Sequence, residues 1–229
     1  INYNLTPALK ASITLNTDFA ETEVDDRQIN LTRFAIRFPE KRDFFLEGAN
    51  IYQFAPRSGV YPYFSRKIGL QSGNPIPVLY GGRIIGKIGK VEIAAQQVKT
   101  RKTDLVNSED FTVLRLKQNF LKESSIGVLY TRRHTKNGEQ LTEPLQDRNT
   151  LGIDLTLNTS SFLSNQNLQF QAFAVIHNPH SPNDMNKSPW DRSARGLRFN
   201  FPNQPWSGSL SYREFGTSYD PAVGFSRRN

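Results

Sequence analysis

Hydrophobic and polar residues alternate with a period of two along most of this chain. The clearest stretch is 150–158, where Leu151, Ile153, Leu155 and Leu157 oppose small and polar residues. This period indicates a β-strand with one apolar and one polar face. The weakest candidate is 109–120, because apolar residues fall on both of its faces. The pattern predicts strands near 8–17, 78–88, 90–100, 109–120, 124–134, 148–158, 167–178, 194–202 and 206–216.

The connections between these strands are alternately short and long. Tight turns are expected at Gly89, 121–123 and 203–205, whereas 101–108, 135–147 and 179–193 are long and 159–166 is intermediate. An up-and-down membrane barrel has this rhythm, with short turns on one side of the bilayer and long loops on the other. The expected strands also approach the about 9–11 residues of a tilted bilayer crossing, rather than the about 5–6 of soluble strands. A soluble sandwich is the alternative, and it gives no reason for the rhythm.

Residues 34–69 interrupt the alternation. Aromatic residues there mix with charges of both signs at neither the helical nor the strand period, as in Phe44-Phe45-Leu46-Glu47. Such a segment cannot bury one clean face, so it needs a cavity with apolar and polar walls. We therefore predict an all-β fold, an antiparallel up-and-down meander that is part of a large transmembrane β-barrel with an inward-folded segment. Residues 18–77 would form the plug-like segment in the lumen, and 78–229 the strand meander.

Composition narrows the class of protein. Hydrophobic residues make up only 37% of the 229 residues, and no stretch has the apolar length of a membrane helix. The chain has no cysteine, which excludes disulfides and thiolate metal sites. The formal charge of +8 is scattered rather than gathered in one run, so no nucleic-acid partner is expected. Because the chain begins at Ile1 without a leader and ends without a finished strand, we expect a fragment of a longer polypeptide.

Several motifs occur in a fixed order along the chain. They are Asn16-Thr17-Asp18-Phe19, Val24-Asp25, Asn30-Leu31-Thr32-Arg33-Phe34, the run from Phe38 to Gly48, and Phe64-Ser65-Arg66-Lys67-Ile68-Gly69. Together they resemble the barrel domain of a family of Gram-negative outer-membrane proteins, domain of unknown function 5916. The likeness is strong up to about Gly69 and diffuse over the rest of the chain. Asp43 stands where the family often has Pro, and Lys67 where a second Arg is usual; both changes keep the polarity of the segment.

The resemblance implies a location in the bacterial outer membrane, with its lipid bilayer as a partner. In that family the barrel usually follows a periplasmic domain similar to family 9 carbohydrate-binding modules. That domain and the remaining barrel strands are absent from this sequence. The expected function is uptake, export or binding of glycan-related material or another small ligand. The alternative is a membrane-associated carbohydrate-active hydrolase, although we identify no catalytic residues, no cofactor and no metal site.

Six charged residues of the inserted segment form the candidate ligand-binding set. Arginine forks hydrogen-bond carboxylates and hydroxyls in bidentate geometry, which suits an anionic or sugar ligand. The favoured alternative is structural, because buried charges must be paired and the segment holds both signs. The two glutamates could also act as an acid/base pair on a glycosidic bond. The six residues are Arg37, Glu40, Lys41, Arg42, Glu47 and Arg66.

Three further groups have competing interpretations. The carboxylates of Asp18, Glu21, Glu23, Asp25 and Asp26 could bind Ca²⁺, but they lack the spacing of a calcium loop. We expect them instead to neutralise the basic inserted segment. His177 and His180, with Asp184 nearby, could contribute to a metal site, although surface histidines are the favoured interpretation. Aromatic residues near strand ends could form an interfacial girdle or pack on loops; they are Phe111, Phe120, Tyr130, Trp206 and Phe215.

Overall fold

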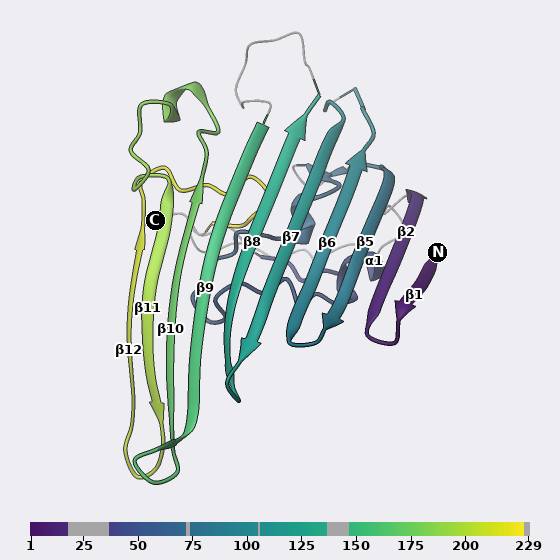
Figure 1. The fold of residues 1–229 in the computed structure, drawn as a ribbon. Coiled ribbons are helices and arrows are strands. Elements are labelled where there is room, and N and C mark those ends of the chain that lie inside the picture. Colours follow the sequence, from purple (N-terminus) through teal and green to yellow (C-terminus); the bar gives the residue numbers. More distant parts are fainter. Residues whose placement is uncertain (18–36, 72–73, 105, 137–146, 227–229) are drawn as a thin grey trace.

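The computed structural model describes residues 1–17, 37–71, 74–104, 106–136 and 147–226 (Figure 1). These residues form a ten-stranded antiparallel sheet and a separate two-stranded sheet. Within the described ranges, no helix is long and apolar enough to cross a membrane. The large sheet contains β1 (Asn2–Thr6), β2 (Leu9–Thr17), β5 (Val78–Ile88), β6 (Val91–Thr100), β7 (Glu109–Phe120), β8 (Ser124–Thr135), β9 (Asp147–Phe162), β10 (Gln166–His177), β11 (Ser193–Pro202) and β12 (Ser207–Phe215), in that spatial order.

The short elements lie outside this sheet. They are α1 (Asp43–Leu46), the 3-10 turns η1 (Ser65–Lys67) and η2 (Pro182–Asp184), and the small pair β3 (Leu70–Gln71) and β4 (Asn74–Pro75).

All nine strands expected from the alternation are confirmed, and the sheet is an antiparallel meander. The first strand, β1, carries too few residues to show a period and was not predicted. β9 continues to Phe162, so the connection expected to be intermediate is a turn of residues 163–165. Leu163, Ser164 and Asn165 all have positive φ, at 38°, 68° and 82°, which reverses the chain within those three residues.

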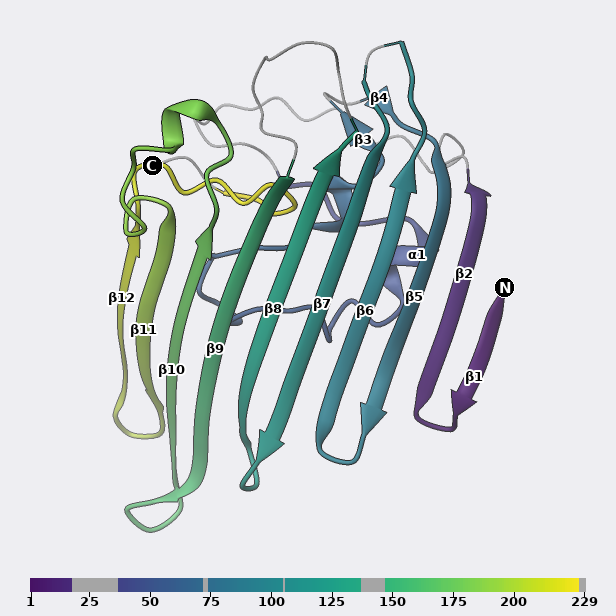
Figure 2. The same cartoon turned by 45° about the horizontal axis from the view of Figure 1, so that its top comes forward.

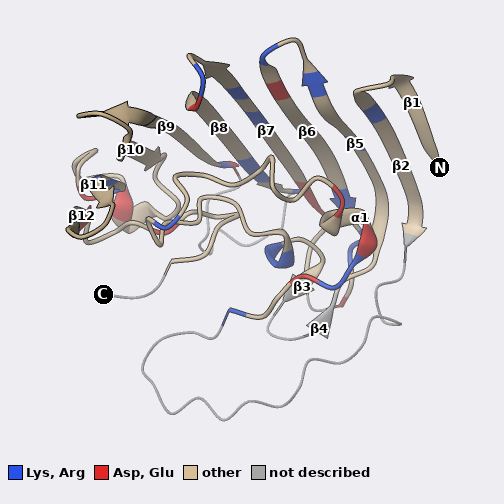
Figure 3. Cartoon of the chain, turned by 90° about the horizontal axis from the view of Figure 1, so that it is seen from below, with Lys and Arg blue, Asp and Glu red and all other residues tan. Residues whose placement is uncertain are grey.

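The sheet is curved and open. β1 pairs only with β2, and β12 only with β11, so each outer edge of the sheet lacks a partner among the described residues. Short turns gather at one end of the strands and long connections at the other, in both Figure 1 and Figure 2. Seen along the strands in Figure 3, the sheet forms an arc with residues 37–69 on its concave side.

The convex, outer face of the sheet is apolar, and most of it is left uncovered by the described residues. The register places Leu116, Val128, Ile153 and Ala174 side by side on four successive strands. Ile153 is 48% exposed, and its neighbours on this face are similarly open. The large apolar residues exposed on the outer face are Ile13, Leu15, Tyr80, Ile84, Ile88, Leu114, Leu116, Ile126, Val128, Leu151, Ile153, Ile176, Leu197, Phe199, Leu210 and Tyr212.

The concave, inner face carries both polar and apolar residues and is partly covered. Ser12, Arg83, Gln96, Arg115 and Asp154 lie on it, and all five are buried. The cover consists of residues 37–69, here called the inner segment, and of residues 216–226 that follow β12. The sheet thus differs from the usual soluble arrangement, in which the face that is left uncovered is polar.

A hydrophobic core fills the space between the inner face and its cover. It explains why 109–120 alternated poorly: Phe111 and Val113 are buried in this core, whereas Leu114 and Leu116 point outward. The expectation of an interfacial girdle is therefore wrong for Phe111, and also for Phe215, which packs against the same core. The core comprises Phe45, Tyr52, Phe54, Ala55, Val60, Ile68, Val78, Ile85, Ala94, Val98, Phe111, Val113, Leu129, Phe173, Val175, Ala194, Tyr219 and Val223.

Candidate functional site

The inner segment is held by arginines that reach its backbone and carboxylates. Arg42 is buried, with only 3% of its side chain exposed. Its Nε and Nη2 atoms donate to the two carboxylate oxygens of Glu40, each at 2.7 Å. The same guanidinium donates to the carbonyl oxygens of Ile68 (2.6 Å) and Ser65 (2.9 Å). The buried Arg42 side chain thus joins the start of the inner segment to its end. These contacts balance the charge of the guanidinium and satisfy most of its N–H donors.

A second clamp joins the segment to the sheet. Arg83 of β5 donates to the carboxylate of Glu47 (2.6 Å) and to the backbone carbonyl oxygens of Glu47 (3.0 Å) and Phe44. Lys10 of β2 binds the other oxygen of the same carboxylate. The Arg83 guanidinium also lies 4.9 Å from the centre of the Phe44 ring. These contacts fix α1 and its following turn over β2 and β5.

A third clamp lies near the middle of the sheet. The Arg115 Nη2 atom donates to Asp154 Oδ2 at 3.0 Å, and Arg115 Nη1 binds the other carboxylate oxygen. The Ala55 backbone N–H of the inner segment also donates to Asp154 Oδ2, at 3.3 Å. A Cβ built at Gly127 would lie 2.6 Å from Arg115 Nη1, and one at Gly152 would lie 2.7 Å from the Phe54 ring. Glycine at these two positions is what allows the guanidinium and the ring to approach the sheet.

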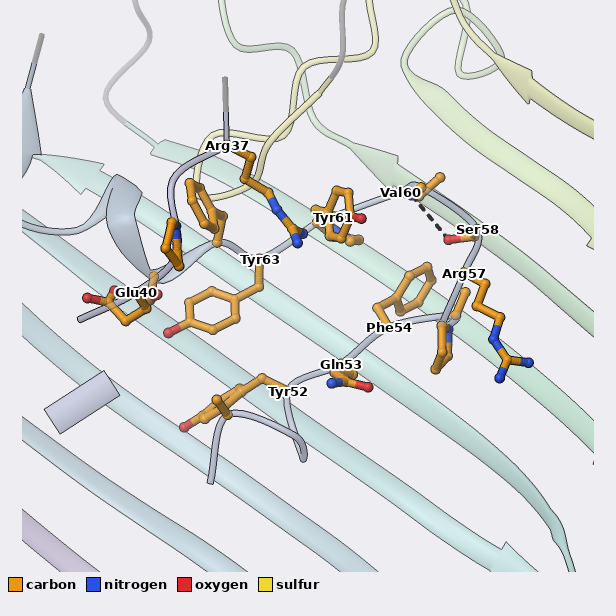
Figure 4. A pocket seen from close by; sticks show the side chains of 18 of the residues that line it. Arg37, Glu40, Tyr52, Gln53, Phe54, Arg57, Ser58, Val60, Tyr61 and Tyr63 are labelled. Carbon is orange, nitrogen blue, oxygen red and sulfur yellow. Dashed lines mark hydrogen bonds between the residues drawn. The ribbon is translucent and has the colours of Figure 1, made fainter. Parts of the chain in front are cut away.

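An aromatic cavity of about 470 Å³ lies within the inner segment (Figure 4). The rings of Tyr52 and Tyr63 stand 5.0 Å apart, and Tyr63 Oη accepts a hydrogen bond from Gln96 Nε2 at 2.9 Å. Burial raises the pKa of both tyrosines, so their hydroxyls stay protonated. The Tyr52 hydroxyl is buried without a hydrogen-bond partner in the described part of the chain. The aromatic lining comprises Phe38, Phe45, Tyr52, Phe54, Tyr61, Tyr63 and Phe64.

The structure divides the six predicted site residues. Arg37 and Glu40 line the aromatic cavity, where the Arg37 guanidinium lies 4.1 Å from the centre of the Tyr61 ring. Arg42 is turned instead toward backbone carbonyls of the segment. Arg66 donates to the Pro39 carbonyl oxygen at 2.9 Å. The backbone N–H of Lys41 donates to Glu40 Oε1 at 3.1 Å. Glu47 lies apart from the other five, against β2 and β5.

These pairings support the structural interpretation of the charged residues. They also argue against Glu40 and Glu47 as an acid/base pair. Burial alone raises the pKa of Glu40, but the hydrogen bonds and charge of Arg42 outweigh it and leave the pKa below its usual value. Hydrogen bonding from Lys10, with help from Arg83, lowers the pKa of Glu47. Both carboxylates are therefore ionised at neutral pH, whereas a glycosidase acid needs a raised pKa. The segment pairs Glu47 with Arg83, a partner that lies outside the predicted set.

The interpretation of His177 and His180 as surface histidines is wrong. They are 2% and 7% exposed, and their rings stack 4.1 Å apart. His177 Nε2 lies 3.1 Å from the Asp220 backbone nitrogen and 2.9 Å from the Ser218 carbonyl oxygen, so it joins β10 to the C-terminal cover. In the described residues no group of three or more His, Cys, Asp and Glu could hold a metal ion. The pair packs the connection between β10 and β11 onto that cover.

His180 should make this connection sensitive to acid. Burial, then the neighbouring His177 and Arg148, lowers the pKa of His180 from 6.5 to about 3. A group with this shift contributes its full stability above pH 6.5 and loses it as the pH falls toward 3. At pH 5 the docked connection should be weaker by about 2 kcal/mol. We expect faster amide hydrogen exchange over residues 178–192 at pH 5 than at pH 7, after correction for intrinsic rates.

A His180→Phe variant is the control for this experiment. The phenyl ring keeps the stacking on His177 but cannot titrate, so its exchange should be nearly independent of pH. Equal pH dependence in both proteins would show that another group is responsible.

Sequence reasoning missed two parts of this site. The C-terminal cover, residues 216–226, pairs with the inner segment through Tyr61 and Phe225, whose rings lie 6.4 Å apart. The aromatic lining was also not singled out, although aromatic residues are dense between 44 and 64. The predicted neutralising role of the acidic run at 18–26 falls outside the described residues.

Comparison with known families gives one result. Residues 1–170, which are more than half of the chain, match the family described as domain of unknown function (DUF5916). No curated protein and no solved structure matches the chain.

Proposed function

We propose that this chain, which belongs to the DUF5916 family of domains of unknown function, forms part of the wall of an outer-membrane β-barrel and binds glycan-related material in the lumen. The inner segment would be the plug of this barrel, and the aromatic cavity would lie on the ligand's path. Binding would serve uptake or export of the ligand.

The observation that carries the proposal is the exposed apolar outer face of the sheet. A sheet of ten strands exposes a continuous apolar outer face and buries charged residues beneath a cover. Apolar area of this extent on a water-soluble protein favours aggregation or association, whereas lipid accommodates it without cost. In β9 the apolar outward positions, from Leu151 to Leu157, lie between Asn149 and Thr159. The stretch 150–158 matches the about 9–11 residues of a tilted bilayer crossing.

The open edges also support a barrel. β1 and β12 leave rows of backbone donors and acceptors unpaired within the described sheet. In a bilayer such groups must find partners, and closure by further strands is the solution that leaves no edge. The proposal therefore includes additional strands between β12 and β1.

The aromatic cavity supports a ligand with both apolar faces and hydroxyl groups. Aromatic rings offer flat apolar surfaces, and polar groups at the margin fix the orientation of what binds there. The buried Tyr52 hydroxyl, without a partner in the described residues, is available to such a ligand. Figure 4 shows Glu40 and Arg57 at opposite ends of the cavity, so the lining changes in character along its length. Sugar rings have this combination of apolar faces and hydroxyls.

Single-cysteine labelling tests the membrane arrangement. The 229 residues contain no cysteine, and any cysteine elsewhere in the full-length protein is first replaced by serine. A spin label at Ile153→Cys on the outer face should be accessible to oxygen dissolved in lipid and protected from a water-soluble nickel complex. The matched label at Gln171→Cys on the inner face should show the opposite preference. The measurement is power-saturation EPR of the full-length protein in lipid vesicles.

The other possible outcomes identify the alternatives. A label at Ile153→Cys that the nickel complex reaches would indicate an outer face in water. Protection from both reagents would indicate a second sheet packed over it, as in a sandwich. Either result would contradict the proposed barrel.

A further inference from the structure

A second cavity, of about 450 Å³, lies between the inner segment and strands β9, β10 and β11. Its floor is a regular array on the inner face. The register places Thr156, Gln171 and Arg198 in one row across the three strands. The adjacent row consists of Asn158, Gln169 and Asn200.

The array presents more hydrogen-bonding groups than it uses internally. Asn200 Nδ2 donates to Gln169 Oε1 at 3.0 Å, and Gln171 Nε2 reaches Thr156 Oγ1 at 3.5 Å. Asn158 Nδ2 donates outside the array, to the Glu123 carbonyl oxygen at 3.1 Å. Because every amide side chain carries both donors and an acceptor, the Gln169 amide nitrogen and the amide oxygens of Gln171 and Asn200 are left without a partner among the described residues. Neighbours within a row stand on strands about 4.8 Å apart, so the remaining groups form a closely spaced polar surface.

Two arginines complete the cavity and have no hydrogen-bond or ion-pair partner within the described part of the chain. Arg198 stands in the floor, and Arg57 comes from the inner segment above it. The other arginines described on the inner face, at positions 83, 115, 133, 148 and 213, all bind a carboxylate or a backbone carbonyl. No Asp or Glu is among the residues described as lining this cavity.

This lining selects the chemical class of the ligand. A guanidinium without a counter-charge in a protein cavity is suited to an oxyanion, which it binds through two parallel hydrogen bonds. The amide array suits a partner with many hydroxyl groups. The cavity shares Gln53, Pro56 and Arg57 with the aromatic cavity, so one extended ligand could contact both.

We propose that this amide–arginine cavity binds an acidic carbohydrate, an oligosaccharide whose carboxylate or sulfate groups engage Arg57 and Arg198 while its hydroxyls engage the amide array. The inference deepens the proposed glycan-binding function and rests on it for the placement of the cavity in a lumen. It assigns the preference for anions to two residues outside the sequence-predicted set.

The test measures binding by isothermal titration calorimetry with the full-length protein in detergent micelles. The probes are trigalacturonate, a sulfated disaccharide, neutral maltotriose and inorganic phosphate. Trigalacturonate or the sulfated disaccharide should bind more tightly than maltotriose, and their comparison distinguishes the carboxylate from the sulfate. Arg198→Gln should weaken acidic-sugar binding about tenfold, the effect of losing charged hydrogen bonds. The double variant Arg57→Gln/Arg198→Gln should remove the preference for the acidic sugar.

Arg132→Gln is the matched control, because it removes the same charge at an exposed position on the outer face. Its affinity for the acidic probe should equal that of the unaltered protein. Unchanged thermal unfolding of Arg198→Gln would confirm that the fold is intact, as expected for a side chain without internal partners.

Three results would overturn the inference: maltotriose binding as tightly as the acidic sugars, no binding of either acidic sugar, or arginine variants that bind like the unaltered protein. Phosphate that binds as tightly as the acidic sugars, with the same arginine dependence, would reject the carbohydrate part. These results are separate from failure of the barrel, which the EPR label at Ile153→Cys reports without any ligand.

Discussion

Replacing Asp154 with alanine is expected to destabilise the protein by about 3–5 kcal/mol, because it leaves a buried charge without its partner. The Arg115 side chain is 1% exposed and the Asp154 side chain 6% exposed. The substitution also removes the acceptor of the Ala55 backbone N–H, which docks the inner segment on the sheet. Urea unfolding of the full-length protein in detergent micelles measures the loss of stability, and trypsin susceptibility of residues 37–69 reports undocking of the segment.

Two further variants test whether the loss of stability comes from the burial of the Arg115–Asp154 pair. Asp147→Ala removes the same residue type from the same strand, but the Asp147–Arg132 pair is exposed and should contribute only about 0–1 kcal/mol. The double variant Arg115→Met/Asp154→Leu replaces the buried pair with apolar groups and should recover most of the lost stability. If Asp154→Ala is no more destabilising than Asp147→Ala, Arg115 does not hold the segment in the way its contacts indicate.

The fold was largely predictable because the signal of a strand lies in residues that are close together in the sequence. A two-residue period over about ten positions is enough to place a strand, and all nine predicted strands are present. The same period does not predict which face of the sheet other segments cover. That depends on what packs against the sheet, and the apolar residues at 111 and 113 blurred the alternation because they meet the inner segment.

The site was less predictable because its contacts join distant positions. Arg42 could be expected to pair with Glu40, two residues away, but Arg83 and Asp154 stand in strands whose polar positions all look alike in sequence. Only the register shows that Asp154 lies opposite Gly127 and within reach of Arg115. The amide–arginine cavity likewise depends on three strands being aligned. Its signal in the sequence is an excess of Asn and Gln at the polar positions of 166–171, without acidic residues to balance Arg198.

Replacing Ile153 with arginine is the second large effect that we expect, and it separates a lipid-facing sheet from a water-facing one. Arginine at the bilayer midplane of a barrel costs about 2–4 kcal/mol, and about 0–1 kcal/mol near the interface. Ile153 lies in the middle of the outward apolar positions of β9, whereas Thr159 lies beyond their end. Ile153→Arg should therefore reduce folded protein in the outer membrane sharply, while Thr159→Arg should have little effect.

The difference between Ile153→Arg and Thr159→Arg distinguishes lipid from water at the outer face. Both positions are solvent-accessible in the sheet and both variants add the same charge, so a water-facing surface would tolerate each within about 0.5 kcal/mol. The measurement is the folded fraction in isolated outer membranes, read from the heat-dependent mobility of the full-length protein in gel electrophoresis. A Leu197→Arg variant on β11 should repeat the Ile153 result, because Leu197 is 51% exposed on the same face. Equal, small effects at all three positions would mean that the outer face meets water, and the proposed barrel would have to be abandoned.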